Sequence, residues 1–165
     1  MNMQLNYEIT QLLAEESLCL DRREFRRWLD YYTDDALYWV KGWSDDPNAG
    51  IAVIYDDKER MGERVFRLLD TSAYAQMPPS KTIHVNGPVS NVVEDGETIS
   101  AETSVIIAEI RPGDLSQVGL AEPRAVYARV SLELRRAEDG GLRIRKKTID
   151  LLDREQPLYN LTFIL

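Results

Sequence analysis

The chain has 165 residues, of which 44% are hydrophobic and 29% are charged, a composition typical of a globular protein with a core of its own. Its formal net charge of −8 argues against binding to nucleic acid or to an anionic membrane surface, because both depend on Lys and Arg. Cys19 and His84 are its only Cys and His, so this chain alone cannot supply the ligands of a structural zinc site, a Rieske iron–sulfur centre or an iron facial triad.

The N-terminal residues predict no targeting segment. Residues 1–9 lack a cationic start and a long apolar run, which excludes a signal peptide of the usual kind. No stretch approaches the roughly 20 apolar residues that a membrane helix requires. A single cysteine cannot form an intrachain disulfide, so nothing indicates an oxidising compartment. We therefore expect a cytoplasmic location and no membrane partner.

Helical periodicity dominates the first part of the chain. Residues 4–20 predict a helix, because apolar side chains recur on one face: Leu5, Ile9, Leu12, Leu13 and Leu20. Asp21 followed by Glu24 resembles a capping box and predicts that a second helix begins there. The apolar face of this second helix would comprise Phe25, Trp28, Leu29 and Tyr32.

A short strand and a third helix are predicted next. Residues 36–40 are aromatic and aliphatic and follow a chain reversal at Asp34-Asp35, which is typical of a strand. Residues 41–50 contain two glycines and a proline and predict a loop. Asp56 or Asp57, with Glu59, repeats the capping pattern and predicts a helix with Met61, Val65, Leu68 and Leu69 on its buried face.

Beyond Ser80 the hydrophobic period changes to two, which predicts strands. The first of these alternates through Ile83, Val85 and Val89 and is interrupted at Gly87-Pro88 by a bulge or bend. Two long strands follow after a turn at residues 94–96, with alternating apolar residues Ile99, Ala101, Thr103, Val105 and Ile107, then Val126, Ala128, Val130, Leu132 and Leu134. A turn at 139–141 leads to a strand over 142–152, and residues 159–165 predict a last strand or an apolar tail.

The order of these elements indicates an α+β fold. Helices precede a run of strands, an arrangement in which three N-terminal helices pack on one face of a curved, mostly antiparallel sheet. The sequence has no internal repeat, no low-complexity segment and no linker that would divide it. We expect residues 1–165 to form a single domain.

Several strings in this order resemble one family. They are Asp21-Arg22-Arg23 with Trp28-Leu29, Thr33-Asp34-Asp35-Ala36 with Tyr38-Trp39-Val40, Ile54-Tyr55-Asp56-Asp57 with Arg60, Arg64-Val65 and Arg67-Leu68, Pro78-Pro79-Ser80-Lys81-Thr82-Ile83-His84 with Val89-Ser90-Asn91-Val92, Ile149-Asp150-Leu151-Leu152-Asp153 and Asn160-Leu161. Together they resemble the small (β) subunit of aromatic-ring-hydroxylating (Rieske non-haem iron) dioxygenases, of the nuclear-transport-factor-2-like or SnoaL-like superfamily. The chain departs from the family in Asn86-Gly87-Pro88, which is inserted, and in Phe163, which lies one position early.

The resemblance implies a cone-shaped nuclear-transport-factor-2-like (cystatin-like) fold and a structural, non-catalytic role. The partner it implies is a large (α) subunit that carries a Rieske 2Fe-2S cluster and a mononuclear iron, usually in an α3β3 hexamer in which the small subunit self-associates as a trimer. Such an oxidoreductase adds dioxygen to an aromatic ring, in aromatic compound catabolism, with electrons from NAD(P)H. We therefore expect this chain to contain no catalytic, cofactor-binding or metal-binding residues.

A few residues nevertheless invite a catalytic interpretation. His84 lies in an alternating strand and faces away from Ile83 and Val85, so we interpret it as a structural or interface histidine. Asp34 and Asp35 could place a general base at a cone mouth, as ketosteroid isomerases of this fold do, but Asp is also favoured in turns at a junction of helix and strand.

Aromatic residues and the cysteine have a structural interpretation too. The aromatic residues at helix and strand spacing are expected in the core or at an interface rather than in a pocket, and these are Tyr31, Tyr32, Tyr38 and Trp39. Cys19 is expected to be buried and inert. Two alternatives stay open: a free-standing isomerase, dehydratase or cyclase-like enzyme with Tyr31, Asp35 and His84 around an open pocket, and a small-ligand-binding protein.

Overall fold

Helices form one layer of the molecule. The computed structural model describes residues 2–113, 116, 120–157 and 161–165. The long helix α1 is followed by a single turn, α2, which continues into a short 3-10 helix, η1; α3 and a second 3-10 helix, η2, come after the first strands. Their bounds are Met3–Asp21 (α1), Phe25–Trp28 (α2), Leu29–Tyr31 (η1), Lys58–Asp70 (α3) and Tyr74–Gln76 (η2).

Strands form the second layer. In the described part of the chain, seven strands make one sheet of order β2-β1-β7-β6-β5-β3, with β4 also paired to β5. Only β1 and β7 pair in parallel, and the other described pairs are antiparallel, as the sequence predicts. The bounds are Tyr32–Val40 (β1), Ile54–Asp57 (β2), Lys81–Asn86 (β3), Ser90–Asp95 (β4), Thr98–Ile110 (β5), Arg124–Arg136 (β6) and Leu142–Leu151 (β7).

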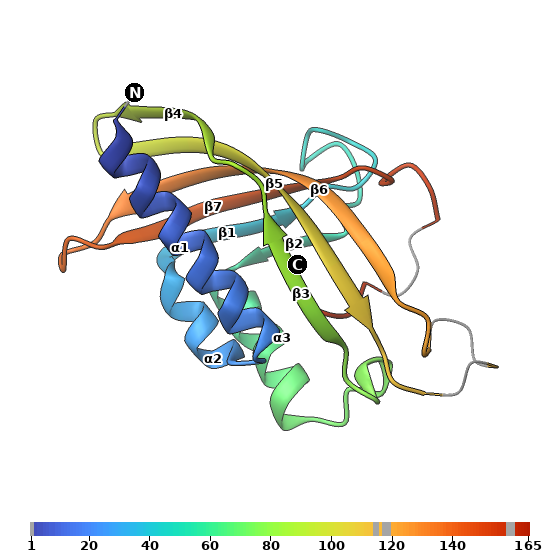
Figure 1. Cartoon of the computed structure of the whole chain (residues 1–165). Helices are drawn as coiled ribbons and strands as arrows, with labels where there is room; N and C mark the ends of the chain where they lie inside the picture. Colours follow the sequence, from blue (N-terminus) through green and yellow to red (C-terminus); the bar gives the residue numbers. More distant parts are fainter. Residues whose placement is uncertain (1, 114–115, 117–119, 158–160) are drawn as a thin grey trace.

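The core lies between these two layers. The curved sheet wraps around the side on which α1, α2 and α3 gather (Figure 1). Every apolar side chain that alternation in β5 and β6 predicts to be inward is buried, from Ile99 to Ile107 and from Val126 to Leu134. The apolar face of α1 packs onto them, with Leu5, Ile9 and Leu13 almost fully enclosed. Hydrophobic burial therefore follows the expected spacing in both layers.

Helix α3 begins where its carboxylate cap predicts. The Asp57 side chain accepts a hydrogen bond from the backbone N–H of Arg60 at 2.9 Å, so Asp57 rather than Asp56 is the N-cap. Asp56 instead lies within β2, a strand that the sequence did not predict, and pairs with Arg64 at 2.7 Å. Within α3, Met61, Val65 and Leu68 are buried, and Leu69 is partly buried against the core.

The predicted capping box at Asp21 is wrong. Asp21 is the last residue of α1, and the N-cap of α2 is Glu24, whose side chain makes no capping hydrogen bond. The second helix is consequently one turn long, and β1 begins at Tyr32, four residues earlier than the strand predicted from residue 36. The Asp21 carboxylate instead accepts hydrogen bonds from side chains of β3. This long-range contact overrides the local capping pattern.

Gly87 interrupts the predicted strand by a close backbone approach. The Gly87 N–H donates to the Ser104 carbonyl at 2.8 Å, and the Thr103 hydroxyl donates to the Gly87 carbonyl at 2.9 Å. A Cβ atom on Gly87 would lie 2.4 Å from the Ser104 Oγ, so a larger residue here would require the Ser104 hydroxyl to rotate away. The interruption separates β3 from β4 while both pair with the continuous strand β5.

The C-terminal segment folds into the hollow of the sheet (Figure 1). Residues 158–160 lie outside the described part of the chain, and residues 161–165 form no strand, so the alternative prediction of an apolar tail is confirmed for them. Phe163, Ile164 and Leu165 are buried in the core. The Tyr38 hydroxyl donates to the Leu165 main-chain oxygen at 2.7 Å and accepts from its nitrogen at 3.1 Å. This segment therefore closes one side of the cone.

We predict that Phe163→Ala lowers the free energy of unfolding by about 3 kcal/mol, because it removes a buried aromatic ring and leaves a cavity. The matched control is Phe66→Ala on α3, where the ring is 60% exposed and its loss should change stability by less than about 0.5 kcal/mol. Urea denaturation measures both values. Equal effects of the two substitutions would contradict the placement of the tail in the core.

Candidate functional site

A buried polar cluster lies inside the cone, where the sheet curves around α1. Glu16 of α1 is 1% exposed, and both of its carboxylate oxygens accept from the Lys147 ammonium of β7, at 3.0 and 2.9 Å. The Trp28 ring N–H and the Tyr32 hydroxyl also donate to Glu16, at 3.1 and 2.5 Å. An ion pair this deeply buried persists only when such additional hydrogen bonds offset its desolvation. We call these four residues the interior cluster.

A β-bulge places Lys147 in the interior cluster. The pairing of β6 with β7 shifts register between Glu133 and Leu134, so Leu134 faces Ile144, whereas Leu132 faces Lys147. The alternation of inward and outward side chains along β7 is therefore shifted by one residue after the bulge. As a result Lys147 points inward, while Lys146 lies at the surface beside Glu133. The shift therefore decides which of two adjacent lysines meets Glu16.

Aromatic rings enclose the interior cluster. The rings of Trp28, Tyr32 and Tyr38 meet edge to face, with centroids 5.1, 5.5 and 6.4 Å apart, an arrangement that fills space around the Glu16 carboxylate. Burial, and then the negative charge of Glu16, raise the pKa of Tyr32 well above its usual range. Tyr32 is therefore a hydrogen-bond donor to Glu16, and its hydroxyl is not a general base at neutral pH.

The interior cluster was not singled out from the sequence. Glu16 falls on the apolar stripe of α1, four positions after Leu12 and four before Leu20, and a charge at a core position is the signal that could have found it. No equivalent signal exists for Lys147, because plain alternation in β7 does not reveal the bulge.

His84 is buried against α1, on the opposite face of β3 from Ile83 and Val85, as its parity predicts. Its side chain is 2% exposed, and its Nδ1 lies 2.6 Å from an Asp21 oxygen. The Thr82 hydroxyl and the His84 backbone N–H also donate to Asp21, at 2.9 and 3.1 Å. No described residue contacts the His84 Nε2 by a hydrogen bond. The geometry makes His84 a tether between β3 and the end of α1.

Asp34 and Asp35 lie within β1 rather than at a turn, and both are exposed. Asp35 accepts from the Thr33 hydroxyl at 2.8 Å and pairs with Arg135 and Arg145 at 3.0 and 3.3 Å. These contacts lower the pKa of Asp35, first through the Thr33 hydrogen bond and then through the arginine charges. A carboxylate stabilised in this way on the surface is a poor general base, and it does not face the cone interior.

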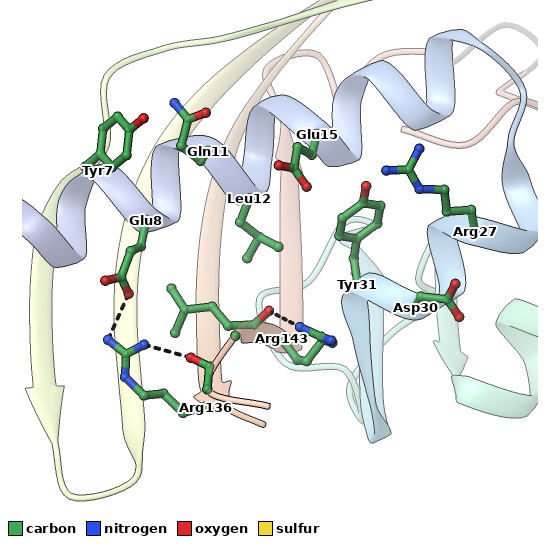
Figure 2. Close-up of a pocket in the computed structure, with 13 residues that line it drawn as sticks. Tyr7, Glu8, Gln11, Leu12, Glu15, Arg27, Asp30, Tyr31, Arg136 and Arg143 are labelled. Atoms are coloured by element: carbon green, nitrogen blue, oxygen red, sulfur yellow. Dashed lines mark hydrogen bonds and ion pairs between the residues drawn. The ribbon is translucent and has the colours of Figure 1, made fainter. Parts of the chain in front are cut away.

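Tyr31 borders a surface hollow of about 530 Å³ between α1 and the turn that joins β6 to β7 (Figure 2). Within that hollow, Glu8 pairs with Arg136 at 2.8 Å. His84 borders a different hollow of about 370 Å³, between α1 and β3. The structure thus places Tyr31, Asp35 and His84 in three separate locations, so the pocket required by the free-standing enzyme alternative does not assemble from them.

The remaining residues singled out from the sequence are buried. Tyr32, Tyr38 and Trp39 are buried as expected. Cys19 is 1% exposed, its thiol donates to the Glu24 carbonyl at 3.1 Å, and burial raises its pKa to about 11. A thiol with that pKa is almost wholly protonated at neutral pH and is a weak nucleophile.

Neither a metal cluster nor a membrane span is found within the described ranges. Among residues 2–113, 116, 120–157 and 161–165, no three His, Cys, Asp or Glu side chains come together as metal ligands would. None of the helices in that part of the chain combines the length and apolarity needed to cross a bilayer.

Comparison with known sequences gives consistent matches. The family model described as ring hydroxylating beta subunit matches residues 15–155. The toluate 1,2-dioxygenase subunit beta of Pseudomonas putida is 31% identical over 90 residues, an alignment that covers 50% of this chain and only 56% of that subunit. The anthranilate 1,2-dioxygenase small subunit of Acinetobacter baylyi is 28% identical over 161 residues, or 93% of each chain.

Comparison with solved structures agrees on the fold. A chain in the structure of naphthalene 1,2-dioxygenase with indole bound in the active site matches with a TM-score of 0.81 and 20% identity, covering 100% of this chain and 88% of that chain. An NTF2-like protein with a cystatin-like fold from Novosphingobium aromaticivorans matches with a TM-score of 0.61 and 19% identity, covering 89% and 81%. The predicted nuclear-transport-factor-2-like fold is confirmed.

We predict that Lys147→Met lowers the free energy of unfolding by about 3–5 kcal/mol, because it leaves the buried Glu16 carboxylate without its cation. The double variant with Glu16→Gln should recover part of this loss, since the uncompensated charge is then gone. Arg26→Met, which breaks the exposed pair with Asp70, is the control and should cost less than about 1 kcal/mol. Urea denaturation followed by Trp fluorescence provides the values, and a single Lys147→Met variant as stable as the control would refute the cluster.

We also predict a pH-dependent role for Asp21. Burial raises the pKa of Asp21, but its hydrogen bonds with His84 outweigh burial and hold the pKa below the usual range. A carboxyl with a lowered pKa in the folded state stabilises the protein above its unfolded pKa near 4 and loses that contribution as the pH falls through the folded value. Asp21→Asn should therefore destabilise the protein at pH 7, and its deficit should shrink below about pH 4. A deficit that stays constant from pH 7 to pH 3, in denaturation curves at each pH, would contradict this.

Proposed function

Because the chain belongs to the ring-hydroxylating beta-subunit family, we propose that it is the structural, non-catalytic subunit of a multicomponent dioxygenase that hydroxylates aromatic rings in aromatic compound catabolism. The observation that carries the non-catalytic part of this proposal is the interior cluster. Its carboxylate, ammonium, indole and hydroxyl groups satisfy one another, and the surrounding rings and the segment from Phe163 to Leu165 are packed around them. A substrate at this position would have to displace a buried ion pair, which costs several kcal/mol.

The iron centres of such an enzyme would reside on the large subunit. A Rieske centre uses two cysteines and two histidines, and a facial triad uses two histidines and a carboxylate, whereas this sequence holds one residue of each kind. Both residues are already engaged, since the Cys19 thiol donates to Glu24 and His84 binds Asp21. Electrons and dioxygen would therefore act on the partner chain, and this chain needs no cofactor.

The assembly we propose is an α3β3 hexamer in the cytoplasm. In it, this chain self-associates as a trimer and binds the large subunit. A permanent interface of this kind buries on the order of 2,000 Å² or more. Exposed apolar side chains suited to burial occur on several sides of the molecule: Trp43, Ile51, Phe66, Tyr74, Val85 and Tyr127. Their presence supports a subunit that has partners.

Co-expression with a large subunit tests this proposal. We expect the two chains to co-purify, the mass of the complex to equal three copies of each, and all bound iron to accompany the large subunit. The purified chain alone should contain no iron and oxidise no arene. Native mass spectrometry and iron analysis provide the readouts. A chain that stays monomeric beside its large subunit, or that turns over a substrate unaided at a rate abolished by one inward substitution, would overturn the proposal.

A further inference from the structure

An exposed apolar row crosses the outer face of the sheet, on the side away from the helices. Val85 of β3 lies opposite Ile106 of β5, which lies opposite Tyr127 of β6. Leu152 extends the row, because its N–H donates to the Tyr127 carbonyl at 2.9 Å. A cross-strand row places these side chains about 5 Å apart, so they form one continuous surface.

The neighbouring cross-strand row is apolar as well. Ile83 lies opposite Ala108, which lies opposite Ala125, all on the same outer face. The larger side chains of the two rows are 45% exposed at Ile106 and 69% exposed at Leu152, with Ile83, Val85 and Tyr127 between these values. We call the two rows together the apolar patch. Contiguous apolar surface on a sheet is a signature of a protein interface, whereas scattered single residues are not.

The apolar patch has a basic border. Lys81 precedes Ile83 by two residues and Arg129 follows Tyr127 by two, so both cations lie on the outer face at opposite sides of the patch. Both are exposed, and neither forms an ion pair with another residue that the structure describes. In a chain with a formal net charge of −8, two unpaired cations beside an apolar surface indicate a partner that presents carboxylates.

The same chain carries a surface of the complementary kind. The turn between β4 and β5 exposes the carboxylates of Glu94, Asp95 and Glu97, which make no ion pair within the described ranges. Val93 beside them is 56% exposed, and Gly96 adopts a positive φ of 60° that closes the turn tightly. This acidic tip lies near the N-terminal end of α1, at the opposite end of the sheet from the start of β3 (Figure 1).

We propose that the acidic tip of one copy of this chain docks on the apolar patch of a second copy, with Glu94 and Glu97 facing Lys81 and Arg129. This inference rests on the proposed function and names the surfaces of its self-association. The two surfaces differ, so the contact is head-to-tail, and repetition around an axis closes a ring rather than a two-fold dimer. A ring leaves each tip and each patch covered, which removes exposed apolar area from every copy.

Charge reversal tests the contact on the full-length chain. Lys81→Glu with Arg129→Glu should raise the dissociation constant of self-association at least about tenfold, and so should Glu94→Lys with Glu97→Lys. All four substitutions in one chain restore opposite charges, and should bring the constant back to within about threefold of the unaltered protein. Sedimentation velocity over a range of concentrations measures these constants, and native mass spectrometry repeats the comparison on the complex with the large subunit.

Two further variants separate charge from apolar contact. Tyr127→Ser removes the aromatic side chain at the centre of the patch and should weaken self-association at least about tenfold, because central aromatic residues dominate interface energies. Arg22→Glu with Arg67→Glu makes the same change in net charge as the Lys81 and Arg129 pair, on two exposed arginines of the helical layer. This control should leave self-association unchanged. Circular dichroism establishes that each variant keeps its fold.

The outcomes distinguish this inference from the proposed function. Weaker self-association in each charge-reversed pair, together with restored self-association in the fourfold variant, would support the contact. Self-association that survives both reversals and Tyr127→Ser would overturn it while leaving the structural role intact. Reversals that abolish binding of the large subunit but not self-association would assign the patch to that partner and equally overturn it. An unaltered chain that never self-associates, alone or in the complex, would contradict both proposals.

Discussion

The ion pair between Glu16 and Lys147 is the interaction on which the architecture depends. It joins the C-terminal half of α1 to the central strand β7 across the interior of the cone, and the hydrogen bonds from Trp28 and Tyr32 tie α2 and β1 to the same carboxylate. A buried charge tolerates little displacement from its partners, because each lost contact leaves an unsatisfied group in a medium of low dielectric constant. The ion pair therefore sets both the rotation and the axial position of α1 on the sheet.

Other contacts follow from that position. With α1 anchored at Glu16, its last residue, Asp21, meets β3 at His84 and Thr82, and Ser17 meets Asn86. The helix thus covers the free edge of β3, which would otherwise be open to pairing with another chain. The opposite, outer face of β3 keeps its apolar side chains exposed. The same helix position that closes the edge leaves the outer face as the surface on which a partner can bind.

The arrangement has a consequence for function. In this fold the hollow between helices and sheet is the natural place for a ligand, but a fold alone does not decide its use. Here the hollow holds the interior cluster and the buried residues Phe163 to Leu165. The exposed apolar side chains of the apolar patch lie instead on the outer surface of the molecule. The exposed charged side chains of its basic border and of the acidic tip lie on the surface too. A molecule built in this way is suited to binding other proteins through its surface.

Much of this protein can be deduced from sequence alone. The spacing of apolar residues predicted α1, α3 and the inward faces of β5 and β6, since local periodicity reports which face of an element is buried. The turn residues Glu94-Asp95-Gly96 predicted the turn between β4 and β5. One histidine and one cysteine are too few to build a Rieske centre or an iron facial triad from this sequence alone. Tertiary structure alone decided that Lys147, and not Lys146, points inward. It also decided the pairing of Asp21 with His84, 63 residues away. The alignment of Val85, Ile106 and Tyr127 in one cross-strand row is likewise a tertiary feature. These features depend on bulges, strand register and contacts between distant segments, which no local pattern of residues encodes.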